Sequence, residues 1–135
     1  MIRCVRLWTG EDQNSYFEEG WLELETGPHA DLLTGQLPAT TVSFQETASG
    51  GALDLHTAPV RQLVITLSGT LDFQTRDGEH FLLHPGDILL AEDTVGSGHS
   101  WKLIEGPVVI RAKKAPTTAK ASLATPSPPR AQPKA

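Results

Sequence analysis

Short runs of β-branched and aromatic residues alternate with turn residues along most of the chain, and no segment repeats its apolar residues every 3.6 positions. The clearest run, residues 61–67, lies between Pro59 and Gly69 and is rich in Val, Ile and Leu, which predicts a strand. Similar runs predict further strands at residues 2–9, 16–24, 40–46, 53–56, 71–75, 80–83, 88–91, 99–104 and 108–112. Many short strands separated by Gly, Pro and Asp are typical of an all-β sandwich or barrel.

Two turns are expected in the middle of the chain. Ser68-Gly69 is expected to reverse the chain between residues 61–67 and 71–75. The next turn is expected at Arg76-Asp77-Gly78-Glu79, because the Asp-Gly pair within it is a hairpin signal.

The composition changes near Lys113, where Ala, Pro, Thr and Ser begin to dominate. Such a segment buries too little apolar area to offset the entropy lost on ordering it. We therefore expect a folded domain at residues 1–112, including an N-terminal strand extension, and a disordered Ala/Pro/Lys-rich tail at residues 113–135.

The net charge of −5 is unevenly distributed. Residues 1–112 carry 16 acidic and 6 basic side chains, a net charge of −10, whereas no Asp or Glu follows Glu105. A domain this acidic repels phosphate backbones, so we expect no nucleic-acid partner. No run approaches the ~20 apolar residues of a membrane span, and the first residues lack a signal-peptide layout. We expect a cytoplasmic protein that does not bind membranes.

The segment from Gly50 to Gly69 resembles the first sequence motif of the cupin superfamily. In that motif a Gly is followed after five residues by His-x-His, then by a Glu, and six residues later by a second Gly. Here His56 occupies the first His position, Ala58 the second, and Gln62 the Glu position, with the spacing kept throughout.

The second cupin motif is matched by Pro85-Gly86-Asp87 leading into a strand, and by His99 at the motif's His position. The chain is also similar to small bacterial cupins that carry His-x-Ala-Pro-x-Arg-Gln and Ala-Glu-Asp-Thr-x-Gly-x-Gly-His. The resemblance covers roughly residues 40–112. It implies an all-β fold of the cupin type, a double-stranded β-helix (jelly-roll) barrel, and a homodimer, because cupins commonly pair through edge strands that would otherwise stay exposed.

Alternation along strands indicates which side chains converge, because successive residues point to opposite faces. If Gln62 faces the barrel interior, as its motif position implies, Val64 and Thr66 follow it inward. On the later strand His99 and Trp101 share one face. We therefore expect a pocket for a small organic molecule lined by Val64, Thr66 and Trp101.

Within this pocket, His56, Gln62 and His99 are the candidate metal ligands, and the metal would be a divalent transition ion such as Mn, Fe, Ni or Zn. Glu92 and Asp93 are candidate catalytic acid/base groups, and Glu46 is a further acidic candidate. The alternative is that the histidines line a metal-free pocket and that Glu92 and Asp93 cap turns.

Two functions stay open at this point. The chain is either a metal-dependent enzyme of isomerase, lyase or dioxygenase type, or a non-catalytic module that binds a small ligand without metal. We further expect His29, His80 and His84 on the surface, and Arg61 in an ion pair at the rim or surface.

Overall fold

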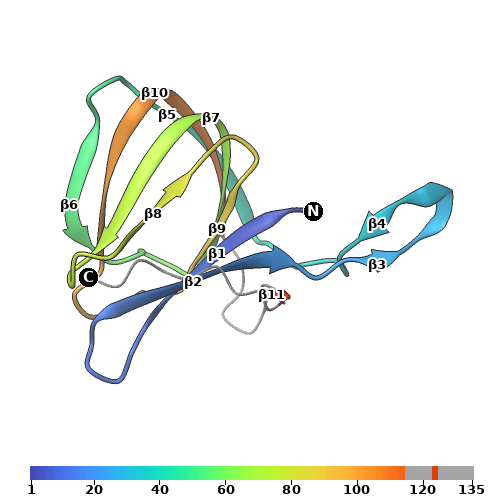
Figure 1. Ribbon diagram of the computed structural model, residues 1–135, viewed down its shortest axis with the longest axis horizontal. Helices are drawn as coiled ribbons and strands as arrows, with labels where there is room; N and C mark the ends of the chain where they lie inside the picture. The colour runs from blue at the N-terminus through green and yellow to red at the C-terminus, as the bar shows by residue number, and fades with distance from the viewer. Residues whose placement is uncertain (115–122, 125–135) are drawn as a thin grey trace.

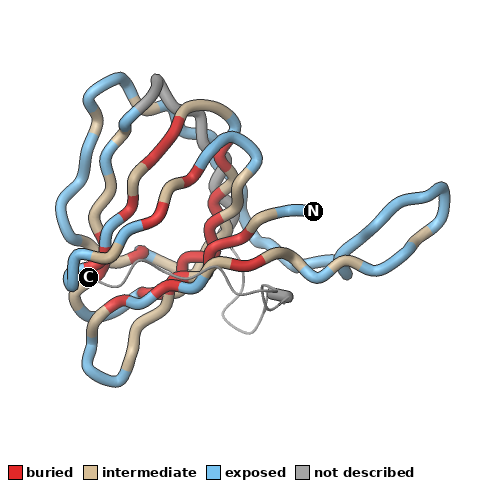
Figure 2. Tube along the Cα trace, viewed as in Figure 1, coloured by how far each residue is buried: buried red, intermediate tan, exposed pale blue. Residues whose placement is uncertain are grey.

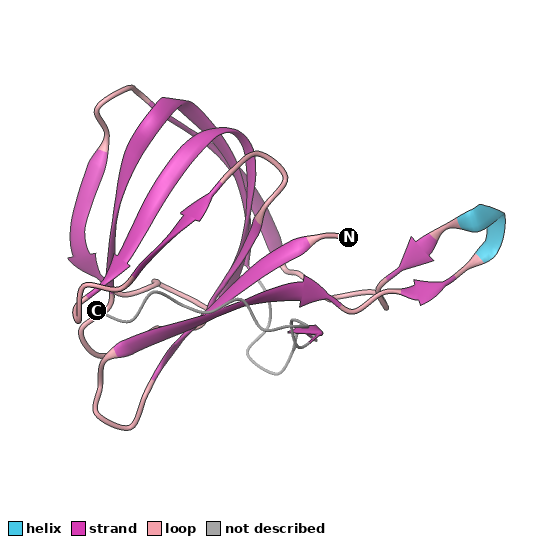
Figure 3. Cartoon of the chain, in the orientation of Figure 1, coloured by secondary structure: helices cyan, strands magenta, loops and turns pink. Residues whose placement is uncertain are grey.

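The structure is a computed structural model that describes residues 1–114 and 123–124, with side chains as far as Ile104. This part of the chain is all-β, as predicted, and its only helical segment is the short 3₁₀ helix drawn in cyan in Figure 3. Its elements are β1 (Arg3–Thr9), β2 (Ser15–Leu22), β3 (Glu25–Thr26), the 3₁₀ helix η1 (Pro28–Ala30), β4 (Leu32–Leu33), β5 (Thr41–Thr47), β6 (Ala52–His56), β7 (Gln62–Thr75), β8 (His80–Leu83), β9 (Ile88–Ala91), β10 (His99–Lys114) and β11 (Leu123–Ala124).

Nine of these strands form one mixed sheet with the order β11-β2-β1-β9-β7-β10-β5 (Figure 1). Strands β6 and β8 pair with β10 and β7 outside this path. The β1–β9 pair is parallel, and the other pairs are antiparallel. Among the described residues β5 stays at an edge, so the pairings do not close a barrel.

The two long strands β7 and β10 divide the sheet into two halves that share them. Near Gln62, β7 pairs with β9 while the end of β10 pairs with β5. Beyond Leu71, β7 pairs with β8 while the start of β10 pairs with β6. The sheet bends where the halves meet, so that they wrap around a common interior (Figure 1).

The predicted chain reversal at Ser68-Gly69 is wrong. Gly69 has φ +78° inside the continuous strand β7, and the pairing with β10 shifts register beside it. A glycine at positive φ within a strand produces a bulge that bends the strand without ending it. The Asp77-Gly78 turn is confirmed: Gly78 has φ +90°, and the hydroxyl of Thr75 donates to Asp77 Oδ1 at 2.6 Å.

The core lies between the two halves of the sheet, where buried segments gather in Figure 2. Alternating strand positions supply it, since Val5 and Leu7 on β1 are fully buried. On the other half, the rings of Phe73 and Phe81 stack with centroids 5.2 Å apart. Burial of such side chains is the main contribution to stability in a domain of this kind.

Strands β3 and β4 form a small hairpin that projects away from the sheet (Figure 1). Its residues are almost all exposed, including Leu32 and Leu33. Two-residue strands leave little periodicity to detect, so the sequence did not predict this hairpin. His29 in η1 is exposed, as are His80 and His84, which confirms the prediction for these three side chains.

The end of β10 passes the predicted boundary at residue 112 by two residues, because Lys113 and Lys114 pair with both β7 and β5. Leu123 and Ala124 pair with β2. The remainder of the predicted tail, residues 115–122 and 125–135, lies outside the described residues. In the described part, no helix has the length and apolar character needed to cross a membrane.

Candidate functional site

A cavity of about 380 Å³ lies between the two halves of the sheet and is lined from β5, β6, β7, β9 and β10. Most of its wall is apolar, and includes Val64, Leu71, Phe73, Leu89 and Trp101. Five polar side chains also line it, namely Ser43, Gln45, His56, Gln62 and His99. A cavity with an apolar wall and few convergent polar groups is the usual form of a small-molecule site.

The two histidines of the cavity lie side by side. His56 is the last residue of β6 and His99 the first of β10, and the two are register partners across this antiparallel pair. Their ring centroids are 4.6 Å apart, with the ring planes inclined by 57°. The predicted convergence of these two residues is therefore found in the structure.

Each imidazole is held through its Nδ1 atom. In His56 this nitrogen lies 2.8 Å from the backbone oxygen of Asp54, and in His99 it lies 2.6 Å from Asp93 Oδ2. Neither Asp54 nor Asp93 lines the cavity. In both rings Nε2 is thus the nitrogen that remains for a ligand in the cavity.

Asp93 lies behind His99 and is completely buried. Its Oδ2 also accepts a hydrogen bond from the Ser15 hydroxyl at 2.7 Å, and its backbone oxygen accepts from the N–H of Ala58 at 3.0 Å. No hydrogen-bond partner for Oδ1 is found among the described residues. Asp93 therefore orients His99 and does not contact a ligand in the cavity.

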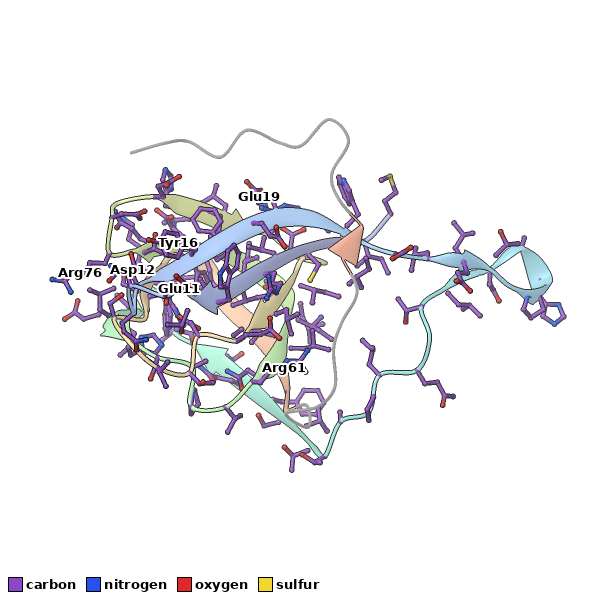
Figure 4. The ribbon with its side chains drawn as sticks, turned by 90° about the horizontal axis from the view of Figure 1, so that it is seen from below. Glu11, Asp12, Tyr16, Glu19, Arg61 and Arg76 are labelled. Atoms are coloured by element: carbon purple, nitrogen blue, oxygen red, sulfur yellow. The ribbon has the colours of Figure 1, made fainter. Side chains whose placement is uncertain are left out.

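Glu92 turns away from the cavity into a double ion pair. Its carboxylate accepts from Arg6 Nε at 2.7 Å and from Arg61 Nε at 2.5 Å. Burial raises the pKa of this carboxyl, but the two guanidinium groups outweigh that effect and hold the pKa below its ordinary value. The ion pair expected for Arg61, which is labelled in Figure 4, is confirmed. Its side chain is only 10% exposed, however, so the pair is not at the surface.

Of the predicted pocket residues, Val64 and Trp101 line the cavity and Thr66 does not. Thr66 is fully buried beneath the turn before β9. There its backbone N–H donates to the backbone oxygen of Asp87, and its backbone oxygen accepts from the N–H of Gly86. The predicted candidates Glu92 and Asp93 do not line the cavity either.

The lining residues that were not singled out from the sequence include Ser43, Gln45, Leu71 and Phe73. The bulge at Gly69 shifts the inward face of β7 from even to odd positions, which brings in Leu71 and Phe73. An isolated glycine inside a strand-like run signals such a bulge. On β5, strand alternation places Glu46 on the face opposite to Ser43 and Gln45.

Among the described residues, no three His, Cys, Asp or Glu side chains are grouped in a way that would hold a metal ion. The donors that line the cavity are the two imidazoles, the carboxamides of Gln45 and Gln62, and the Ser43 hydroxyl. Cys4 is not an additional donor, because it is fully buried away from the cavity and burial raises the pKa of its thiol to about 12.

No protein-family model matches the chain, and no curated protein matches it in sequence. Function must therefore be inferred from the cavity itself.

Proposed function

We propose that the protein binds a small organic molecule in the cavity between the two halves of the sheet. The observation that carries this proposal is the pairing of His56 with His99 in a largely apolar cavity of about 380 Å³, where their ring centroids are 4.6 Å apart. Buried polar groups need partners, and a ligand with an apolar body and polar substituents would supply them.

The architecture we propose is a cupin-type jelly-roll barrel. The support for it is the motif spacing from Gly50 to Gly69, together with an interior that receives both His56 and His99. The continuous bent strands β7 and β10 agree with two half-sheets that enclose a ligand.

A fragment screen by protein-observed NMR tests the binding function. We expect fragments of six to twelve heavy atoms to bind and to shift the indole N–H signal of Trp101, which lines the cavity. His56→Phe should weaken this binding about tenfold, because a polar contact is lost. The exposed histidine His80, which lies outside the cavity lining, gives the matched control His80→Phe, which should leave binding unchanged. If no fragment shifts the Trp101 signal, the proposed function is wrong.

A second candidate, a metal-dependent enzyme, is favoured by one specific observation. Both cavity histidines are held through Nδ1, and histidines that bind metal commonly have their second nitrogen held in this way. His56, His99 and Gln62 fit a weakly held divalent ion such as Mn, Fe, Ni or Zn, since all three donors are neutral. Such an ion would polarise a substrate carbonyl or activate oxygen.

In this second candidate His99 holds the ion through Nε2 and contacts Asp93 through Nδ1, so neither of its nitrogens is left for acid/base catalysis. Glu92 is unsuited to that role, because two arginines already occupy its carboxylate. Elemental analysis of protein purified without a His-tag tests the candidate. The protein is analysed both as purified and after incubation with the four ions. Less than about one-tenth of an equivalent of any transition metal in both samples would contradict this second candidate.

A further inference from the structure

The hydrogen-bond partner of His56 fixes the position of its ring proton. Nδ1 lies 2.8 Å from the backbone oxygen of Asp54, and a carbonyl oxygen can only accept a hydrogen bond. Nδ1 must therefore be the protonated nitrogen. In the neutral ring this leaves Nε2 with a free lone pair, so that it acts as a hydrogen-bond acceptor.

The same reasoning holds for His99. Its Nδ1 lies 2.6 Å from Asp93 Oδ2, and that oxygen already accepts a hydrogen bond from the Ser15 hydroxyl. A carboxylate oxygen accepts and does not donate, so Nδ1 of His99 carries the proton. His99 is only 4% exposed and its ring lies beside Phe73, with centroids 5.6 Å apart and planes inclined by 33°, which restricts rotation of the ring.

In their neutral forms the two rings thus present two neighbouring hydrogen-bond acceptors to the cavity, on rings whose centroids are 4.6 Å apart. Two acceptors cannot satisfy each other, and the acceptor of the buried His99 costs free energy when it has no donor. A ligand that brings only acceptors, such as an ether or a carboxylate, leaves both lone pairs unpaired. A ligand with two adjacent donors pairs with both.

We propose that the cavity selects small molecules that carry two adjacent hydrogen-bond donors, as in a vicinal diol, on an apolar frame. This inference rests on the proposed binding function and specifies its ligand class. His56 and His99 accept the two hydrogen bonds, and the wall formed by Val64, Phe73 and Trp101 contacts the apolar frame. Asp93 is the positioning residue that fixes the acceptor form of His99.

Two measurements on the full chain test the inference. Long-range ¹H–¹⁵N spectra of histidine-labelled protein report which nitrogen of each neutral ring carries the proton, and we expect Nδ1 in both rings. Calorimetric titrations with chelator present then compare cis-1,2-cyclohexanediol with its dimethyl ether. These compounds share the ring but differ in their donors, and we expect the diol to bind at least about tenfold more tightly.

Variants assign the preference to the two rings. Asp93→Asn should reduce the ratio of the two affinities toward one and should broaden or move the His99 ring signals. Ser15→Ala removes only the hydroxyl that donates to Asp93, so the ratio should persist. Because Asp93 is buried, Asp93→Asn can also disturb folding, so His56→Phe serves as a second variant. It removes one of the two acceptors and should halve the logarithm of the ratio of the two affinities.

The outcomes separate this inference from the proposed function. A proton on Nε2 of either neutral ring overturns the inference, as does equal affinity for the diol and its ether. If neither compound binds while other fragments occupy the cavity, the inference alone is wrong. If no fragment of any kind binds, the proposed function is wrong as well.

Discussion

The backbone oxygen of His56 lies 2.0 Å from the position that a Cβ atom at Gly98 would occupy. Gly98 has φ +74°, a region that residues with side chains seldom adopt. It directly precedes His99, so the loop after β9 can approach the end of β6 only because this residue lacks a side chain. The His56–His99 pair depends on that approach.

Gly98→Ala should therefore destabilise the protein by about 2–4 kcal/mol, because strain at positive φ adds to overlap with the His56 carbonyl. Gly86→Ala is the matched control, since Gly86 has φ +92° but nothing within 4 Å of the added methyl group. It should cost only about 1–2 kcal/mol. Urea denaturation of both variants provides the comparison, and equal losses would contradict the close approach.

Glu92→Gln should lower the free energy of unfolding by about 1–3 kcal/mol at neutral pH, because two arginines lose their charged partner. Glu18→Gln is the control: Glu18 is an exposed residue that also pairs with Arg6, at 3.7 Å, and its loss should cost well under ~1 kcal/mol. Chemical denaturation of the two variants beside the wild type measures both values.

The same carboxylate predicts a pH dependence. The pKa of Glu92 is below its ordinary value in the folded state, so its stabilising contribution is complete above about pH 4.5 and is lost as the pH falls through the folded pKa. The difference in stability between wild type and Glu92→Gln should thus shrink below pH 4.5. A difference that stays constant down to pH 3 would show that the ion pairs contribute no pH-dependent stability.

Gln62→Glu separates the metal-free cavity from the metal site by the sign of its effect. In a metal-free cavity, an unpaired carboxylate beside Val64 and Trp101 should destabilise the fold by about 1–3 kcal/mol at neutral pH. In a metal site, the added charge should raise the melting temperature when Mn, Fe, Ni or Zn is present. Gln74→Glu, at an exposed position of the same strand, should change neither the stability without metal nor the melting temperature with metal.

We predict a homodimer that pairs through β5. This strand lies at an edge of the sheet, six of its seven residues are exposed, and Val42 is 51% exposed. Such edges pair readily unless they are protected. Light scattering should give about twice the 14.6 kDa of one chain, and Val42→Lys should shift the mass toward the monomer. Val95→Lys, at a loop residue of similar exposure, should leave the mass unchanged.

The strand pattern and the motif spacing predict much of the site from the sequence alone. His56, Gln62 and His99 line one cavity because their spacing sets the strand positions. Thr66 illustrates the limit, since alternation gives its side of the strand but not the turn that covers it. The roles of Asp93 and Glu92 depend on partners far along the chain, Ser15 and Arg6, which no local pattern reveals.

The continuity of β7 and β10 through both halves of the sheet has a consequence for how the protein opens. A half-sheet held by its own strands could fray alone, but here each long strand is hydrogen-bonded in both halves. Neither half can detach without breaking the ladder of the other. Slow amide hydrogen exchange at Val64 and at Phe73 should therefore report one shared global opening, with the same protection at both sites.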